Sequence, residues 1–240
     1  MADERLIVQP GGTAASLVAL DPGTGDLIWE TPGGKAPYAS LIVASLGGRR
    51  QIVGCDAVSF CGWDLKNGAR LWTLRPEVPG GFHVPSPFVI RGGLILAGER
   101  EGARLYEFTA GGIPSAHPVA RQQELAPDAQ TPVPVGTHIV GLGADGALLC
   151  LDAGTLKVRG RIEDPDLGVY ASCISDNRSR VLTLSETGVL FLHRIEGPSF
   201  KELGRLRVAG KGDHLLSHPA LVKDRLFLRI GKRVVALDLR

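Results

Sequence analysis

Short apolar strands alternate with turn residues along the whole chain, and the pattern recurs at nearly constant spacing. Six copies close their third strand at successive spacings of 43, 45, 43, 42 and 44 residues, at Asp21, Asp64, Thr109, Asp152, Arg194 and Asp238. When the repeats are aligned, a second set of matching positions stands just before another short apolar strand. These positions are 46, 45, 41 and 46 residues apart: Ser40, Ser86, Thr131, Ser172 and His218. We find no helical period longer than a few residues, so the pattern predicts an all-β protein.

Each repeat of about 44 residues predicts four antiparallel strands. The first follows the Ser/Thr column, the second is an apolar run such as 50–54, the third ends at the aspartate position, and the fourth comes next. Four-stranded repeats of this length are typical of a β-propeller, whose blades bury both faces only by stacking around an axis.

Both terminal repeats are incomplete, because the chain begins at a second strand (5–9) and stops after a third (233–238). An open ring leaves exposed strand edges. We therefore expect a single β-propeller domain over residues 1–240 that closes imperfectly, is a segment of a longer propeller, or forms a homo-oligomer through its incomplete blades.

Composition narrows the class of protein. The formal charge of +2 is not gathered into a basic run, so we expect no nucleic-acid partner. No apolar run of about 18 residues and no signal peptide is present in this chain, so no membrane insertion is expected and the compartment stays open. The spacing of Cys55, Cys61, Cys150 and Cys173 favours free, partly buried thiols, with a Cys55–Cys61 bridge as the alternative.

One stretch carries a family motif. Residues 19–29, ALDPGTGDLIW, match A-x-D-x-x-T-G-x-x-x-W throughout, and residues 62–72 keep its Asp, Gly and Trp. This is the tryptophan-docking motif of the pyrroloquinoline-quinone (PQQ) type propeller repeats. Later copies place His117, Gly160 and Glu202 at the tryptophan position. We expect Trp29 and Trp72 to pack in the seam against the neighbouring blade, each N–H finding a carbonyl. The Trp63-Asp64 dipeptide is typical of WD repeats, but only one of the six repeats carries it. The WD-repeat family therefore fits the chain less well than the PQQ-type repeats.

The chain thus resembles bacterial PQQ-like repeat proteins and the propeller lipoprotein of the outer-membrane barrel-assembly machinery. The resemblance implies a periplasmic or exported protein. Quinoprotein dehydrogenases of this superfamily hold the quinone with adjacent cysteines and a cation bound by a Glu/Asn/Asp set. No two cysteines are adjacent here, and Asp128 is the one carboxylate near the segments that lead into inner strands. We therefore expect no cofactor, no metal and no catalytic residue.

The sequence favours a non-catalytic scaffold that binds a protein or peptide partner through its top loops or central funnel. The candidate partner-binding residues are Tyr38, Phe82, His83, Tyr170 and His214, with ordinary loop packing as the alternative. Asp164-Pro165-Asp166 is interpreted as a turn between blades. A quinoprotein-type dehydrogenase remnant, or a small-molecule enzyme using the central channel, is the alternative function.

Overall fold

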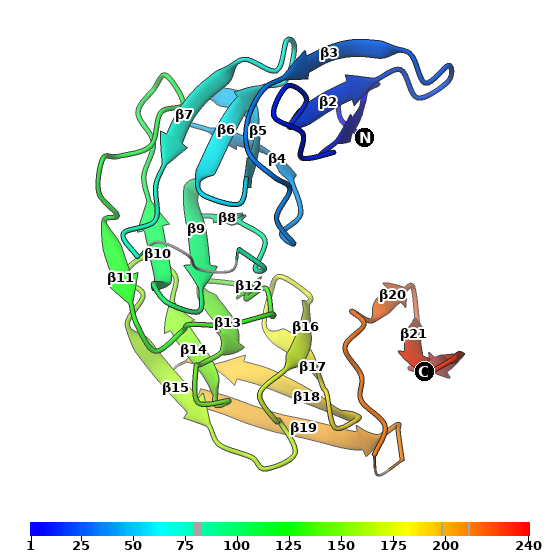
Figure 1. The fold of residues 1–240 in the computed structure, drawn as a ribbon. Coiled ribbons are helices and arrows are strands. Elements are labelled where there is room, and N and C mark those ends of the chain that lie inside the picture. Colours follow the sequence, from blue (N-terminus) through cyan, green and yellow to red (C-terminus); the bar gives the residue numbers. More distant parts are fainter. Residues whose placement is uncertain (79–82, 198, 211) are drawn as a thin grey trace. The chain divides into compact units, whose positions relative to one another are not determined.

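The computed structural model describes residues 1–78, 83–197, 199–210 and 212–240, and this part of the chain contains strands and turns but no helix (Figure 1). It therefore offers no helix long and apolar enough to cross a membrane. The strands form six antiparallel sheets in two compact units, residues 1–123 and 124–240, which are described separately.

The first unit contains three sheets. The first has the order β1-β2-β3 and pairs Leu6–Val8, Leu17–Leu20 and Leu27–Thr31. The second has the order β4-β5-β6-β7 and pairs Ile42–Leu46, Arg49–Cys55, Phe60–Asp64 and Arg70–Leu74. The third has the order β8-β9-β10-β11 and pairs Phe88–Ile90, Gly93–Gly98, Gly102–Tyr106 and Ala120–Gln122.

The second unit repeats this arrangement. The fourth sheet runs β12-β13-β14-β15 through Val133–Val135, His138–Leu142, Leu148–Asp152 and Val158–Ile162. The fifth runs β16-β17-β18-β19 through Ala171–Ser175, Arg180–Ser185, Val189–Glu196 and Ser199–Arg207. The sixth runs β20-β21-β22 through Ala220–Val222, Arg225–Ile230 and Arg233–Asp238.

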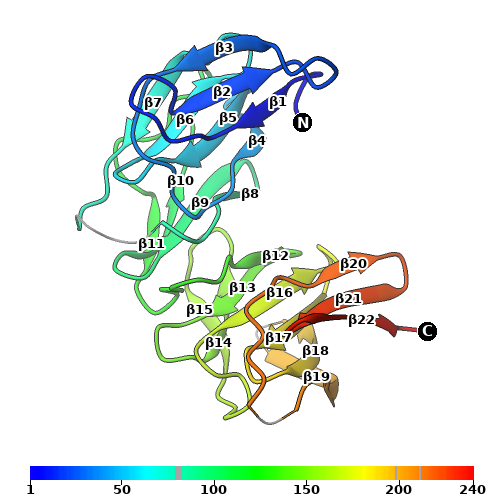
Figure 2. The same ribbon diagram turned by 45° about the vertical axis from the view of Figure 1, so that its right-hand side comes forward.

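The predicted strand order is confirmed for every repeat. The four inner repeats each form one four-stranded meander, and the terminal repeats form three-stranded sheets. Figure 2 shows β1 at the free edge of the first sheet, where a first strand is missing. In the sixth sheet β22 is the free edge, where a fourth strand is missing.

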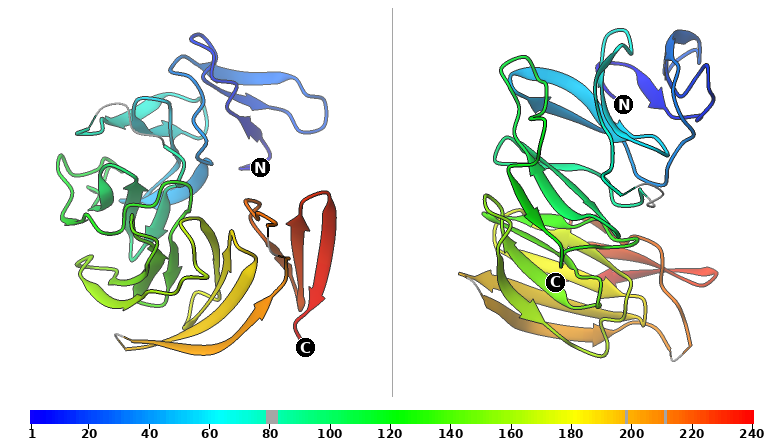
Figure 3. Two further views of the ribbon diagram at one scale, coloured as in Figure 1. Left: turned by 60° about the horizontal axis from the view of Figure 1, so that its bottom comes forward. Right: turned by 60° about the vertical axis from the view of Figure 1, so that its left-hand side comes forward.

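Apolar faces of consecutive sheets pack together within each unit. Buried residues of the first and second sheets form one core that includes Leu17, Trp29, Ile52 and Trp63. The second and third sheets, the fourth and fifth, and the fifth and sixth share further cores. Figure 3 shows the sixth sheet in red beside the fifth in yellow and orange. Alternation along each strand supplies these faces, because successive side chains point to opposite sides of a sheet.

The indole of Trp29 reaches the second sheet. It lies against Gly68 in the β6–β7 turn, where an added Cβ would come within 2.5 Å of Trp29 Cε3. Gly68 has φ +71°, a left-handed conformation that favours glycine. The turn itself is held by Asp64, whose Oδ1 accepts from the N–H groups of Lys66 and Asn67. The Asp64 turn therefore closes the β6–β7 hairpin and, through Gly68, leaves room for Trp29.

Trp72 joins the second and third sheets through a hydrogen-bonded relay. Its Nε1 donates to Gln51 Oε1 at 2.6 Å, and Gln51 Nε2 donates to the Gly112 carbonyl at 3.0 Å. The ring also meets Phe108 edge-on, with centroids 5.8 Å apart. The expected carbonyl partner is replaced by a side-chain amide. Nε1 of Trp29 is buried without a hydrogen-bond partner, so that expectation was wrong for Trp29.

Two positions assigned to the tryptophan column need correction. Trp29 and Trp72 lie across from Ala19 and Gly62, two residues before the turn aspartate. In the fifth sheet the matching pair is Leu192 with Gly204, and Glu202 instead pairs with His193. The β18–β19 hairpin is two residues longer than the β2–β3 hairpin, which displaces the column. His117 lies in the irregular segment before β11, outside any strand.

The four cysteines are buried free thiols. Cys55 and Cys61 belong to different cores on opposite faces of the second sheet, which explains why no bridge joins them. Burial raises the pKa of Cys55 and of Cys150 to about 12 and that of Cys173 to about 11. The thiolate is the reactive form, so these positions are chemically quiet at neutral pH.

Replacing Gly68 with alanine should test the contact with Trp29. Gly25 holds the same place in the first repeat, with φ +80° and nothing within 4 Å of an added Cβ. Gly25→Ala should therefore cost only the conformational term, about 1 kcal/mol. Gly68→Ala should cost about 1–3 kcal/mol more, because the methyl group overpacks the indole. Urea unfolding followed by circular dichroism measures both, and equal losses would contradict the contact.

Candidate functional site

The candidate residues lie in the segments that lead into the innermost strands. Tyr38 precedes β4 and is 75% exposed, and His83 precedes β8 and is 9% exposed. Tyr170 precedes β16 and is half-buried, and His214 precedes β20 and is exposed. Phe82 lies outside the described residues. The first two belong to one unit and the last two to the other.

In the first unit, His83 is part of the core between sheets rather than of the surface. Its ring lies 4.6 Å from the Phe60 ring, and its carbonyl accepts from Ala39 N–H at 3.0 Å. Burial lowers the pKa of His83, so the ring is neutral at pH 7. The Ala39 bond fixes the loop that carries Tyr38, and Ser40 N–H is held in the same way by Ser86 Oγ at 2.9 Å.

In the second unit, Tyr170 is fixed by carboxylates of neighbouring repeats. Its hydroxyl donates to Asp128 Oδ2 at 3.0 Å. Its backbone N–H and that of Val169 donate to Glu186 Oε1 at 3.4 and 3.0 Å. The structure thus brings Tyr170 together with Asp128, the carboxylate that the sequence places near these segments.

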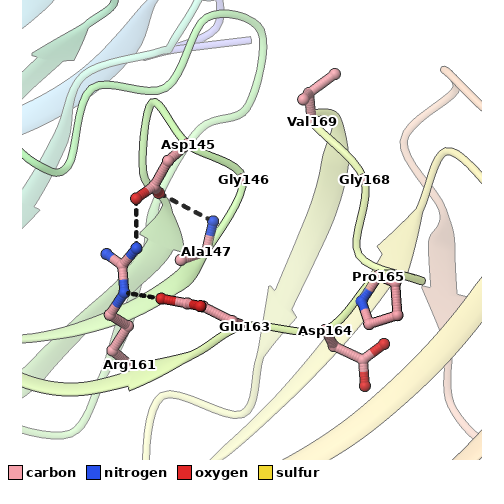
Figure 4. A pocket seen from close by; sticks show the side chains of 9 residues that line it. All are labelled: Asp145, Gly146, Ala147, Arg161, Glu163, Asp164, Pro165, Gly168 and Val169. Carbon is pink, nitrogen blue, oxygen red and sulfur yellow. Dashed lines mark hydrogen bonds and ion pairs between the residues drawn. The ribbon is translucent and has the colours of Figure 1, made fainter.

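A pocket of about 550 Å³ opens at the end of the fourth sheet and is lined in part by Val169, the residue before Tyr170. It lies between the β13–β14 turn, the end of β15 and the connection from β15 to β16 (Figure 4). We call it the acidic pocket. Its lining residues are Asp145, Gly146, Ala147, Arg161, Glu163, Asp164, Pro165, Gly168 and Val169. The lining carries three carboxylates and one guanidinium, so two negative charges are in excess.

Arg161 organises one wall of the acidic pocket. Figure 4 shows its guanidinium between Asp145 and Glu163, with an ion pair to each. Its Nε lies 2.8 Å from Glu163 Oε1, and Glu124 lies 3.7 Å from another of its nitrogens. The hydrogen bond from Arg161 holds the pKa of Asp145 below its ordinary value. One guanidinium therefore meets three carboxylates, and each carboxylate keeps capacity to accept further hydrogen bonds.

The opposite wall is Asp164, which is also held by an arginine. Burial raises the pKa of Asp164, but hydrogen bonds from Asp166 N–H and Arg205 outweigh that effect and leave the pKa lowered. Arg205 lies 2.9 Å from Asp164 and also pairs with Glu202. Asp164 is therefore ionised at neutral pH, as Asp145 is.

His214 borders a second pocket of about 450 Å³ in the same unit. Asp166, Thr187, Arg207, Gly212 and Asp213 complete its lining. Arg207 and Asp166 form an ion pair at 2.7 Å. Since Asp164 lines one pocket and Asp166 the other, the Asp164-Pro165-Asp166 turn separates them. The structure confirms that this turn connects two sheets.

The sequence did not single out Asp145, Arg161 or Glu163. Each looks like an ordinary solvated charge in its own strand or turn, and they meet only because β15 pairs with β14 beside the β13–β14 turn. Nothing in the spacing of these residues signals a site. Among the described residues, no group of three or more His, Cys, Asp and Glu side chains could hold a metal ion.

No protein-family model matches the chain, and no curated protein sequence matches it. Solved structures do. BamB from Moraxella catarrhalis matches 98% of this chain and 70% of its own, with 15% identity and a TM-score of 0.71. The computationally designed Ika8 protein matches 100% of this chain and 69% of its own, with 13% identity and a TM-score of 0.72.

These likenesses define the class of protein. The chain is an all-β protein of propeller type, like BamB, with blades of three or four antiparallel strands. At such identities they show the fold alone. That residues 1–240 act as a single domain stays a prediction.

Proposed function

We propose that this chain is a non-catalytic, PQQ-like propeller scaffold that captures a protein or peptide partner by a basic segment in the acidic pocket. The observation that carries the proposal is the excess of carboxylates over basic side chains in the lining of a pocket of about 550 Å³. A lysine or arginine side chain balances the excess negative charge of the lining and donates to the lone pairs that Asp145, Glu163 and Asp164 still have available. Val169 lines the pocket, and Tyr170, the next residue in the chain, supplies an aromatic side chain for the partner.

The likeness to BamB agrees with a binding role but does not establish one. The family assignment rests on the motif in residues 19–29 and 62–72. The absence of catalytic chemistry also stays a proposal. It is supported by Asp145 and Asp164, which are paired with arginines and whose lowered pKa values keep them ionised rather than poised to transfer protons.

Binding of a fluorescein-labelled Lys-Gly-Ser peptide should test the proposal. We expect Asp145→Asn combined with Glu163→Gln to weaken the affinity by about 5- to 20-fold, because two exposed charge pairs are lost. Arg161→Gln should strengthen it, because the pocket becomes more negative. Since the pKa values of Asp145 and Asp164 are lowered, binding should persist at pH 5 and fall only below about pH 4, as these carboxylates protonate. Fluorescence polarisation measures all three effects.

Glu196→Gln provides a control, since it removes one exposed carboxylate at the end of β18 that does not line the acidic pocket. It should leave the affinity unchanged, and a Glu-Gly-Ser peptide should not bind. Tyr170→Ala should weaken the affinity for the lysine peptide without unfolding the protein. Equal binding of both peptides, or pocket variants indistinguishable from the control, would contradict the proposal.

A further inference from the structure

The second pocket of residues 124–240 shares one turn with the acidic pocket. We call it the His214 pocket, and its volume is about 450 Å³. Asp164 lines the acidic pocket and Asp166 lines the His214 pocket, so the Asp164-Pro165-Asp166 turn is common to both. Both pockets belong to one compact unit, which fixes their places relative to each other.

Two arginines of β19 hold this turn in place. Arg205 lies 2.9 Å from Asp164, and Arg207 lies 2.7 Å from Asp166. Because alternate residues of a strand share a face and lie about 7 Å apart, the two ion pairs stand side by side. The Asp166 carbonyl also accepts from the Thr187 hydroxyl at 2.8 Å. The two aspartates are therefore held at a fixed separation, one in the wall of each pocket.

Carboxylates are in excess in both pockets. The His214 pocket has two aspartates and one arginine, and the acidic pocket has three carboxylates and one arginine. Counting Arg205, which holds Asp164 from β19, the pair of pockets has five carboxylates and three guanidiniums. Residues 124–240 as a whole carry 16 lysines and arginines and 14 carboxylate side chains. The excess therefore belongs to the pockets and not to the composition of the unit.

We propose that the two pockets bind two basic side chains of one extended segment of the partner, one in each pocket, across the Asp164-Pro165-Asp166 turn. The inference rests on the proposed function and deepens it, because it names a partner segment with two lysines or arginines rather than one. An ammonium or guanidinium group donates to the carboxylate lone pairs that the two linings offer. Asp213, for example, accepts the Gly210 N–H at 3.1 Å and keeps further capacity to accept.

The geometry of an extended chain sets the spacing of the two basic residues. Side chains two or four residues apart lie on one face, about 7 or 13 Å from each other, whereas adjacent side chains point to opposite sides. Basic residues at an even spacing can therefore enter both pockets from one segment. Once the first has bound, the second binds from the same molecule, which raises the affinity without any new kind of contact.

Fluorescein-labelled Gly-Ser peptides with two lysines test the inference on the full chain by fluorescence polarisation. Lysines two or four residues apart should give, at one of these spacings or both, an affinity about 3- to 10-fold higher than that of the single-lysine peptide. A peptide with two adjacent lysines is the matched control, because it has the same charge. It should gain only about twofold, since either lysine can then enter the acidic pocket.

Asp213→Asn tests the His214 pocket by itself. The variant removes one charge, and its amide oxygen can still accept the Gly210 N–H. It should abolish the gain from the second lysine and leave the affinity for the single-lysine peptide unchanged. Asp224→Asn removes a carboxylate that lines neither pocket and should change neither affinity. Circular dichroism confirms that both variants are folded.

The failure of this inference is distinguishable from the failure of the proposed function. If no lysine peptide binds, both are wrong. If the single-lysine peptide binds but evenly spaced lysines gain no more than adjacent ones, only the two-pocket inference is overturned. A gain that survives Asp213→Asn would overturn it as well.

Discussion

Replacing Trp63 with alanine should lower the free energy of unfolding by about 3–5 kcal/mol, the loss expected for a fully buried tryptophan. The side chain has no solvent exposure and lies in the core between the first and second sheets. Arg70 covers its ring, with the guanidinium carbon 5.2 Å from the centroid. Alanine would leave a large cavity between two sheets whose other contacts hold them in place. Urea unfolding followed by far-ultraviolet circular dichroism measures the change.

Phenylalanine substitutions separate the packing of the indoles from their hydrogen bonds. Trp63 Nε1 has no partner, so Trp63→Phe loses only ring area and should cost about 1–2 kcal/mol. Trp72→Phe also leaves the buried Gln51 amide without the donor at 2.6 Å, so it should cost about 1–3 kcal/mol more. Equal losses in the two phenylalanine variants would contradict the relay through Gln51.

The propeller architecture could be predicted because it is written in local patterns that repeat. Alternating apolar residues fix the strands, and the turns that begin at an aspartate fix the ends of three of the hairpins. The structure shows why the turns are reliable signals. Asp21, Asp64 and Asp152 each accept backbone N–H groups two and three residues ahead. The residue predicted for the tryptophan position in the fifth sheet was wrong, because two extra hairpin residues change the register there. Spacing alone does not reveal such a change.

The acidic pocket could not be predicted, because it depends on contacts between elements rather than on a motif. Asp145 and Arg161 are sixteen residues apart and meet through the pairing of β14 with β15. Aromatic residues before inner strands are easier to find in the sequence than the pocket charges, but the structure buries some of them and exposes others. Tyr38 is open to solvent, whereas His83 packs on Phe60. One sequence pattern therefore covers both surface and core positions.

A charged pair in the first unit is also invisible to the sequence pattern. Arg104 is 2% exposed and lies in the middle of β10, where an apolar residue is expected. Its guanidinium is 2.7 Å from Glu101 Oε2 and covers the Phe60 ring at 5.6 Å. Glu101 also accepts the Glu77 N–H at 2.6 Å. The carboxylate thus neutralises a buried cation and holds a neighbouring strand end in place.

Glu101→Ala should destabilise the protein by about 3–5 kcal/mol, because it leaves the Arg104 guanidinium buried without a counter-charge. Arg104→Met alone should also be destabilising, since Glu101 then loses its cation. The double variant should be less destabilised than the sum of the single losses, because no unpaired charge remains. Urea unfolding of the four proteins gives the coupling energy directly. Simple additivity within about 0.5 kcal/mol would show that the two side chains do not act as a pair, and Glu101→Gln, which keeps an acceptor oxygen, should fall between wild type and Glu101→Ala.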